Sequence, residues 1–276
     1  MNRTSSVPPK TPPVVFCLSG HDPTGGAGIQ ADIEAVRAMG AHPATLVTAL
    51  TAQDSRNVVD VYPQDPEALM AQGVLLLRDF HVAVIKIGLL GSYKIAQKVA
   101  ELIDMAGPVP VVLDPVLAAG GGTDLAGDHL LSVLRQEILP RVTWITPNVP
   151  EARRLAGRDD LAECAKRLMG MGVREVMITG THDEGAAVIN RWYGREGLTE
   201  WSWPRLPHDY HGSGCTLSAA LAAGIACGLK DVEAAYAAQA LTYAALESAY
   251  PLGHGQWFPA RSRLGAYVGS GDGSHE

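Results

Sequence analysis

The sequence lacks the features that mark several large classes of protein. Its four cysteines form no CxxC pair and have no histidine at metal-ligand spacing beside them, which disfavours a zinc site or a disulfide framework. No apolar run approaches the length of a membrane span, and the polar, proline-rich residues 1–13 have no signal-peptide core. A net charge of −7 gives no general attraction to nucleic acid or anionic lipid. We therefore expect a cytoplasmic protein without a nucleic-acid or membrane partner.

The composition itself is that of an ordinary globular protein, with 47% hydrophobic and 18% charged residues in a chain of 276. No linker rich in proline, glycine and serine divides the chain. We predict a disordered leader over residues 1–13, a single domain over 14–267 and a flexible tail over 268–276. The densest basic spots, at 153–154 and 261–263, are short and are interpreted as solvated surface.

Short apolar runs alternate with longer segments of helical spacing. Continuous apolar runs fit strands that are covered on both faces, and the predicted strands are 14–18, 45–50, 82–87, 109–113, 144–145 and 176–178. The predicted helices are 27–39, 66–78, 94–106, 125–138, 151–156, 161–169, 215–227 and 232–249. This alternation predicts an α/β fold with a central, mostly parallel sheet and helices on both faces. Residues 186–190 and 198–203 flank a turn and predict an antiparallel edge hairpin.

In open α/β sheets, ligands bind at the carboxyl ends of the strands. The first candidate loop, residues 19–28 (SGHDPTGGAG), follows the first strand and opens a helix. Its glycines match neither the dinucleotide-binding fingerprint nor the P-loop. Small residues there allow a ligand to approach the backbone at a helix N-terminus, and a glycine-rich turn without a ligand is the equal alternative.

A second loop, residues 211–216 (HGSGCT), precedes an alanine-rich helix. Backbone N–H groups of Gly212, Ser213, Gly214 and Cys215 at a helix start favour an oxyanion or phosphate hole. At that position we expect a depressed pKa for Cys215, which would let it accept a proton or attack a carbonyl. The alternative is that Cys215 is only a small buried residue.

Two further loops carry oxygen ligands. Asp114 ends an apolar strand, and Asn148 and Glu151 begin a helix. Hard oxygen ligands on neighbouring loops suit Mg²⁺ and a nucleoside triphosphate. Each residue also has a structural interpretation, because Asp114 precedes Pro115 in a turn and Asn148 with Glu151 forms a capping box.

Taken together, these segments resemble the hydroxymethylpyrimidine/phosphomethylpyrimidine kinases of thiamine biosynthesis, within the ribokinase-like superfamily. The resemblance runs from about residue 14 to 246. The motifs that carry it are 20–32 (GHDPTGGAGIQAD), 48–53 (TALTAQ), 86–90 (KIGLL), 114–115 (DP), 146–151 (TPNVPE) and 211–219 (HGSGCTLSA).

The resemblance implies a ribokinase-like fold, a homodimer, and two successive phosphoryl transfers from Mg-ATP. It implies that Cys215 accepts the proton of the first step, with the loop from Gly212 to Cys215 as the anion hole. It also implies a metal site at Asp114 and Glu151. The residues implied at the pyrimidine are Gly20, Ala27, Asp32, Gln53 and Leu89, and those implied at ATP and its phosphates are Asn148, Glu151, Thr179 and Thr181.

One segment departs from the family pattern. Where such kinases often carry a Lys-Gly-Gly-His run, this chain has Thr179-Gly180-Thr181-His182, so a lysine near the transferred phosphate is missing. Lys86 or an arginine is a candidate to compensate. Three alternatives stay open: a pyridoxal kinase on the same scaffold, a non-catalytic pyrimidine-binding protein, and a hydrolase that uses Cys215 and His211.

Overall fold

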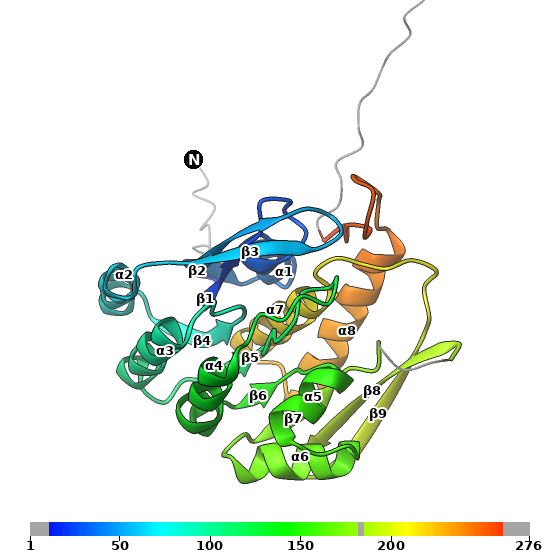
Figure 1. The fold of residues 1–276 in the computed structure, drawn as a ribbon. Coiled ribbons are helices and arrows are strands. Elements are labelled where there is room, and N and C mark those ends of the chain that lie inside the picture. Colours follow the sequence, from blue (N-terminus) through cyan, green and yellow to red (C-terminus); the bar gives the residue numbers. More distant parts are fainter. Residues whose placement is uncertain (1–10, 182–184, 262–276) are drawn as a thin grey trace, which may run out of the picture.

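The computed structural model describes residues 11–181 and 185–261, which form one nine-stranded sheet with helices on both faces (Figure 1). The strand order is β3-β2-β1-β4-β5-β6-β7-β8-β9. Most of the predicted leader and the whole predicted tail lie outside the described residues, and the domain boundaries stay predictions. Within the described part, no helix is long and apolar enough to cross a membrane.

The centre of the sheet is parallel and its two edges are antiparallel. Strands β2, β1, β4, β5, β6 and β7 run in the same direction, while β3, β8 and β9 supply the antiparallel pairings. The strands are β1 (Val14–His21), β2 (His42–Gln53), β3 (Val58–Pro63), β4 (Val82–Ile87), β5 (Val111–Leu113), β6 (Trp144–Ile145), β7 (Glu175–Ile178), β8 (Ala187–Gly194) and β9 (Gly197–Pro204).

Eight α-helices divide between the two faces of the sheet in the described chain. Helices α2 to α6 contribute to one buried cluster, and α1, α7 and α8 contribute to the other. The helices are α1 (Gly28–Ala38), α2 (Pro66–Asp79), α3 (Tyr93–Ala106), α4 (Asp128–Val133), α5 (Val149–Ala156), α6 (Leu161–Gly170), α7 (Ser213–Ala226) and α8 (Asp231–Glu247).

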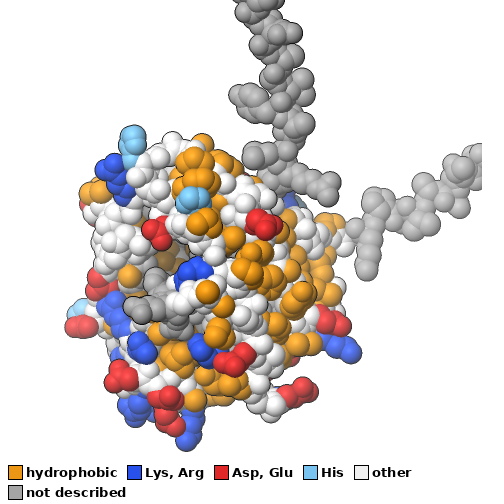
Figure 2. Space-filling model, turned by 90° about the vertical axis from the view of Figure 1, so that its right-hand side faces the viewer, with side chains coloured by type: hydrophobic (Ala, Val, Ile, Leu, Met, Phe, Trp, Pro, Cys, Tyr) orange, Lys and Arg blue, Asp and Glu red, His pale blue; other side chains and the backbone are white. Residues whose placement is uncertain are grey.

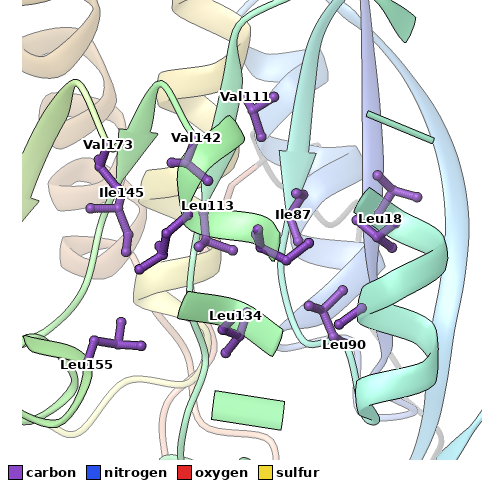
Figure 3. Packing of buried hydrophobic residues seen from close by; sticks show 14 of the residues in the cluster. Leu18, Ile87, Leu90, Val111, Leu113, Leu134, Val142, Ile145, Leu155 and Val173 are labelled. Atoms are coloured by element: carbon purple, nitrogen blue, oxygen red, sulfur yellow. The ribbon is translucent and has the colours of Figure 1, made fainter. Parts of the chain in front are cut away.

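The alternation of side chains along the strands produces these two cores. In β1, Phe16 and Leu18 face the core under α2 to α6, whereas Val15 and Cys17 face α1, α7 and α8. Figure 3 shows the first core, where Leu18, Ile87, Leu113 and Ile145 from adjacent parallel strands meet Leu134 and Leu155 from the helical layer. The continuous apolar runs of the sequence therefore reflect strands covered on both sides, as predicted.

Two parts of the secondary-structure prediction are wrong. Strand β3 was not predicted, because most of its side chains are exposed or half-buried and it lacks a buried apolar run. The helix predicted over 125–138 is α-helical only over Asp128–Val133 and continues as a π-helix (Leu134–Ile138) and a 3-10 turn (Leu139–Arg141). The helix begins later in the chain than predicted. The amide of Leu125 donates to the carbonyl of Leu117, and the amide of Ala126 donates to the side chain of Asp124, so neither forms a helical bond.

The face that carries α8 and β9 exposes hydrophobic side chains among charged ones (Figure 2). Helix α8 contributes Val232 and Tyr236 to the exposed hydrophobic residues of the chain. The predicted edge hairpin is present, since β8 and β9 pair antiparallel through eight residues each. It lies beside α8, where Trp203 packs against Tyr236 and Tyr243.

Candidate active site

The loops that follow the parallel strands meet the start of α7 at one edge of the sheet. Helix α7 begins at Ser213, and its N-cap Gly212 has a φ of +69°. A Cβ on Gly212 would collide with the carbonyl oxygen of Gly26, so the loop 19–28 lies directly against this helix start. Only glycine fits position 212, because both the left-handed conformation and the close backbone approach exclude a side chain.

Cys215 lies in the first turn of α7 and faces polar groups from three other elements. The charged groups that act on its thiol are Asp114, Lys86 and Asp32, and the backbone N–H of Gly28 lies beside its sulfur. Burial and then the charge of Asp114 raise the pKa of Cys215 to about 12, against a smaller lowering by Lys86. The expectation of a depressed pKa is therefore wrong: the helix N-terminus is there, but desolvation and the facing carboxylate outweigh it. Cys215 is a thiol at neutral pH.

Asp114 is buried at the end of β5, as the sequence predicts. The hydroxyl of Ser218 donates to its Oδ2 at 3.4 Å, and a Cβ on Gly214, in the first turn of α7, would lie 3.7 Å from the same oxygen. Burial raises the pKa of Asp114, and the nearby ammonium group of Lys86 opposes that rise. The carboxylate of Asp114 therefore faces the first turn of α7.

Glu151 is buried in the first turn of α5, and both of its oxygens accept backbone N–H groups. Oε1 accepts from Leu117 at 3.0 Å and Oε2 accepts from Asn148 at 3.0 Å. The amide of Glu151 donates in return to Oδ1 of Asn148, which completes the capping box. Burial and then the charge of Asp114 raise the pKa of Glu151 to about 7. Capping does not exclude a role in binding, because each oxygen keeps a free lone pair.

The two carboxylates form a donor set that suits Mg²⁺. Asp114 raises the pKa of Glu151, so a cation between them would relieve the repulsion. In residues 11–181 and 185–261, no group of three or more histidine, cysteine, aspartate or glutamate side chains could hold a metal ion. Mg²⁺ retains waters and is commonly held by one or two carboxylates plus nucleotide phosphates, so this pair fits that ion.

A buried ion pair lies beneath the site. Lys86 on β4 donates to Oδ1 of Asp32 on α1 at 2.7 Å, and Ser19 on β1 donates to Oδ2 of Asp32 at 2.6 Å. All three residues have no exposed surface. Burial would lower the pKa of Lys86, but Asp32, followed by Cys215 and Asp114, raises it above its ordinary value. The contact of Asp32 with a heterocycle stays a prediction, and in this structure its carboxylate binds Lys86.

The other residues implied at the pyrimidine lie around the ends of β1, β2 and β4. Gly20 packs against Leu89, since a Cβ there would lie 2.9 Å from Cδ2 of that side chain. The backbone carbonyl of Leu89 also accepts from Thr48, which fixes the turn after β4. Ala27 is the N-cap of α1, and Gln53 ends β2 with a half-buried side chain. Their roles as substrate contacts stay predictions.

Thr179 and Thr181 differ in their surroundings. Thr179 is half-buried and pairs with Asn148 in an isolated bridge, its amide donating to the carbonyl of Pro147 at 2.9 Å. Thr181 is exposed, and its carbonyl accepts from Arg205 at 2.9 Å. Thr179 is thus adjacent to the capping box of α5, while His182 lies outside the described residues.

Two residues that the sequence interpretation did not select, Asp22 and Gln256, hold the ring of His211. Nε2 of His211 donates to Oδ2 of Asp22 at 2.8 Å, and Nδ1 lies 3.1 Å from Oε1 of Gln256. The Asp22 carboxylate also accepts from Thr24 and from the amide of Ala27. Burial alone would raise the pKa of Asp22, but His211 and Thr24 hold it well below its usual range. In the sequence, the Asp-Pro-Thr-Gly turn at 22–25 is the feature that points to a structural role for Asp22.

This arrangement disfavours the hydrolase alternative. Both ring nitrogens of His211 lie within hydrogen-bonding distance of other groups, Asp22 and Gln256. A Cys-His hydrolase needs the histidine within hydrogen-bond reach of the thiol. Here the charged groups that act on the thiol of Cys215 are Asp114, Lys86 and Asp32, and His211 is not among them.

The interpretation of Arg261 as solvated surface is wrong. Its guanidinium is buried and donates from Nε to Oγ1 of Thr216 at 2.7 Å, from Nη1 to Glu34 at 3.2 Å, and from Nη2 to the carbonyl of Gly26. These partners lie more than 40 residues away in sequence, so no local pattern could have found them. Arg261 joins the loop 19–28 to the first turn of α7.

Comparison with known proteins places this site in context. The family model described as "Phosphomethylpyrimidine kinase" matches residues 22–259. A hydroxymethylpyrimidine/phosphomethylpyrimidine kinase of Streptomyces coelicolor is 38% identical over 260 residues, which cover 91% of this chain and 95% of that protein.

Two solved structures share the fold. An ADP complex of Bacillus subtilis pyridoxal kinase has a TM-score of 0.83 at 30% identity, covering 92% of this chain and 100% of the other. A phosphomethylpyrimidine kinase of Clostridium difficile has a TM-score of 0.74 at 26% identity, covering 84% and 98%.

Proposed function

Because the chain belongs to the phosphomethylpyrimidine kinase family, we propose that it phosphorylates 4-amino-5-hydroxymethyl-2-methylpyrimidine and then its monophosphate with Mg-ATP, in thiamine biosynthesis. The chain is a kinase. The observation that carries the proposal is the start of α7, with Cys215 in its first turn, facing Asp114 at the carboxyl edge of the sheet. Such a helix start receives an anion, and the carboxylates opposite it suit the metal that accompanies a nucleotide.

The helix start supplies the donors for the transferred phosphate. The amide of Thr216 already donates to the carbonyl of Gly212 within the helix, at 3.0 Å. The amides of Ser213, Gly214 and Cys215 precede it and have no acceptor inside the helix. Left free to bind an anion, they would stabilise the equatorial oxygens of the γ-phosphate during transfer.

Asp114 and Glu151 would hold Mg²⁺ beside this helix start. When bound, the ion offsets the negative charge of the nucleotide phosphates. Asn148 and Thr179, next to each other at the ends of β6 and β7, belong to the same phosphate-binding region of the proposal. The charge that the absent lysine would bring is not replaced by Thr179 or Thr181, and Lys86 is already bound to Asp32.

The proton of the first transfer requires a path, because Cys215 is a thiol at neutral pH. For its sulfur to accept a proton from the hydroxymethyl group, its own proton must first pass to another group, and the facing carboxylate of Asp114 is the candidate acceptor. The second transfer needs no such path, since a phosphate acceptor is already ionised.

Pyridoxal is the second candidate substrate. It is favoured by the likeness to the Bacillus subtilis pyridoxal kinase, which is 30% identical and aligns over its whole length. A location in the cytoplasm and assembly as a homodimer belong to the proposal as well.

Steady-state ADP release in the presence of Mg-ATP tests the proposal. We expect kcat/KM for the hydroxymethylpyrimidine to exceed that for pyridoxal by at least about tenfold. We expect Asp114→Asn to lower kcat by about 100-fold through loss of charge stabilisation. Replacement of the exposed Asp79 by Asn is the matched control and keeps wild-type rates. Faster turnover of pyridoxal would support the second candidate, and binding of the pyrimidine without ADP release would identify a non-catalytic binding protein.

A further inference from the structure

The peptide bond between Gly26 and Ala27 is held at both of its polar ends. Its carbonyl accepts from the guanidinium of Arg261, and its N–H, the amide of Ala27, donates to Oδ2 of Asp22 at 2.8 Å. The same carboxylate oxygen accepts from Nε2 of His211. One peptide unit of the glycine-rich loop is thus fixed between an arginine from the C-terminal segment and a paired aspartate.

This peptide lies against the residue that starts α7. Any side chain on Gly212 would collide with the carbonyl of Gly26, and any side chain on Gly26 would collide with the ring of His211. A movement of the 26–27 peptide is therefore transmitted to Gly212 by direct contact. Gly212 precedes the amides that form the anion hole, so the position of this peptide sets the position of those donors.

Arg261 also holds the helix start itself. Its Nε donates to Oγ1 of Thr216, and that hydroxyl donates to the carbonyl of Gly212 at 2.8 Å. A planar guanidinium bonds in three directions here, with Glu34 as the third partner. The guanidinium is almost fully buried, with its side chain 1% exposed. Desolvating a cation is costly, and here directed hydrogen bonds to Thr216, Glu34 and Gly26 offset that cost.

We propose that Arg261 is a positioning residue for phosphoryl transfer, which sets the anion hole by fixing the Gly26–Ala27 peptide and Thr216 against Gly212. The inference rests on the proposed function. In the proposal, Arg261 acts through the carbonyl of Gly26 and the hydroxyl of Thr216. It lies two residues beyond the segment matched by the family model, which ends at residue 259.

The test compares Arg261→Met and Arg261→Lys with a matched control, Arg141→Met. Arg141 also bonds through two nitrogens, to Asp104 at 2.7 Å each, but it precedes β6 and so lies at the amino edge of the sheet. The rates are measured at a temperature where each variant is folded. We expect Arg261→Met to lower kcat about 30-fold with less than about a threefold change in KM, because misplaced donors act on the transition state. Arg261→Lys should restore only a small part of the kcat that Arg261→Met loses, and Arg141→Met should keep the wild-type kcat.

A second measurement does not depend on turnover. We expect hydrogen exchange at the amides of Ala27 and Thr216 to accelerate at least about tenfold in Arg261→Met, with no change in Arg141→Met. If Arg261→Met does not fold, Thr216→Val removes two hydrogen bonds of the same set, from Arg261 to the hydroxyl and from the hydroxyl to Gly212, and should lower kcat about fivefold.

Wild-type kcat in folded Arg261→Met or in Thr216→Val would overturn the inference, as would full recovery in Arg261→Lys or unchanged exchange. A wild-type enzyme that turns over no heterocycle would instead contradict the proposed function. The exchange measurement would still decide whether Arg261 holds the peptide.

Discussion

At the scale of the residue, the chemistry of the site is decided by desolvation rather than by the helix N-terminus. Cys215 has the backbone position that lowers a thiol pKa, yet burial and Asp114 raise it. The sequence located this residue correctly at the start of a helix. It could not provide the sign of the pKa shift, because that depends on a carboxylate 101 positions earlier in the chain and on how far the folded chain desolvates the thiol.

Replacement of Cys215 by Ala tests its role in proton transfer. We expect the first phosphorylation to fall by about 100-fold and the second by less than about tenfold, because only the hydroxyl acceptor must lose a proton. The measurement is single-turnover formation of each product, started from the pyrimidine or from its monophosphate. Equal loss in both steps would argue against the proton role of Cys215.

The Asp22–His211 pair makes stability dependent on pH. The pKa of Asp22 is lowered in the folded protein, so its ionised form stabilises the fold above the unfolded pKa of about 3.9. That contribution is lost as the pH falls below this value, towards the lower pKa of the folded state. We expect Asp22→Asn to reduce the free energy of unfolding by about 1.5–3 kcal/mol at pH 7.

Urea unfolding of Asp22→Asn and wild type at several pH values checks this dependence. The difference between them should shrink steadily below about pH 4, where the carboxylate of the unfolded wild type becomes protonated while that of the folded protein stays ionised. The exposed Asp79→Asn serves as the control and should show no such trend. A difference that stayed constant down to pH 2 would show that the ionised carboxylate is not what stabilises this loop.

Position 26 requires glycine because of a neighbouring side chain and not because of its own backbone conformation. A Cβ at this position would collide with the ring of His211 and lie 2.8 Å from Phe258. We expect Gly26→Ala to lower kcat by about 100-fold by displacing His211 and the helix start behind it. Gly170→Ala, at the end of α6 with nothing near the new methyl group, is the control. Wild-type kcat in Gly26→Ala would contradict this packing.

At the scale of the element, the parallel core was predictable and the edges were not. Apart from Lys86, the run 82–87 is apolar because β4 is covered on both faces, and this pattern can be recognised without tertiary information. Strand β3 was missed because an edge strand has exposed side chains and no periodic signal. The C-terminal segment up to Arg261 was missed for another reason, since its contacts with the site are all long-range.

The buried pair between β4 and α1 supports a prediction about coupling. Lys86→Met leaves Asp32 buried without its cation, and we expect a loss of about 3–5 kcal/mol in the free energy of unfolding. The double variant Lys86→Met/Asp32→Leu should lose less than the sum of the two single variants by at least about 1 kcal/mol.

The exposed pair Arg141–Asp104 is the matched comparison for this cycle, where the coupling should stay within about 1 kcal/mol. Denaturant titration measures both cycles. Additive losses at Lys86 and Asp32 would mean that the pair does not act as one unit under the site.

At the scale of the whole molecule, the site is an assembly of separate chain segments around one helix start. The glycine-rich loop after β1, the carboxylates after β5 and β6, and the C-terminal segment all converge on the beginning of α7. The family resemblance identified the main loops from their motifs. The connections that hold them together, through Asp22, His211 and Arg261, emerge only from the folded chain.

The most direct measurement of the central claim is the mass of the products formed from the hydroxymethylpyrimidine by the purified protein with Mg-ATP. The account predicts that a monophosphate appears first and is then converted to a diphosphate, with one ADP released for each phosphate added. Accumulation of monophosphate alone would contradict the second transfer and point to the missing lysine at Thr179. No phosphorylated product from the pyrimidine would contradict the account as a whole.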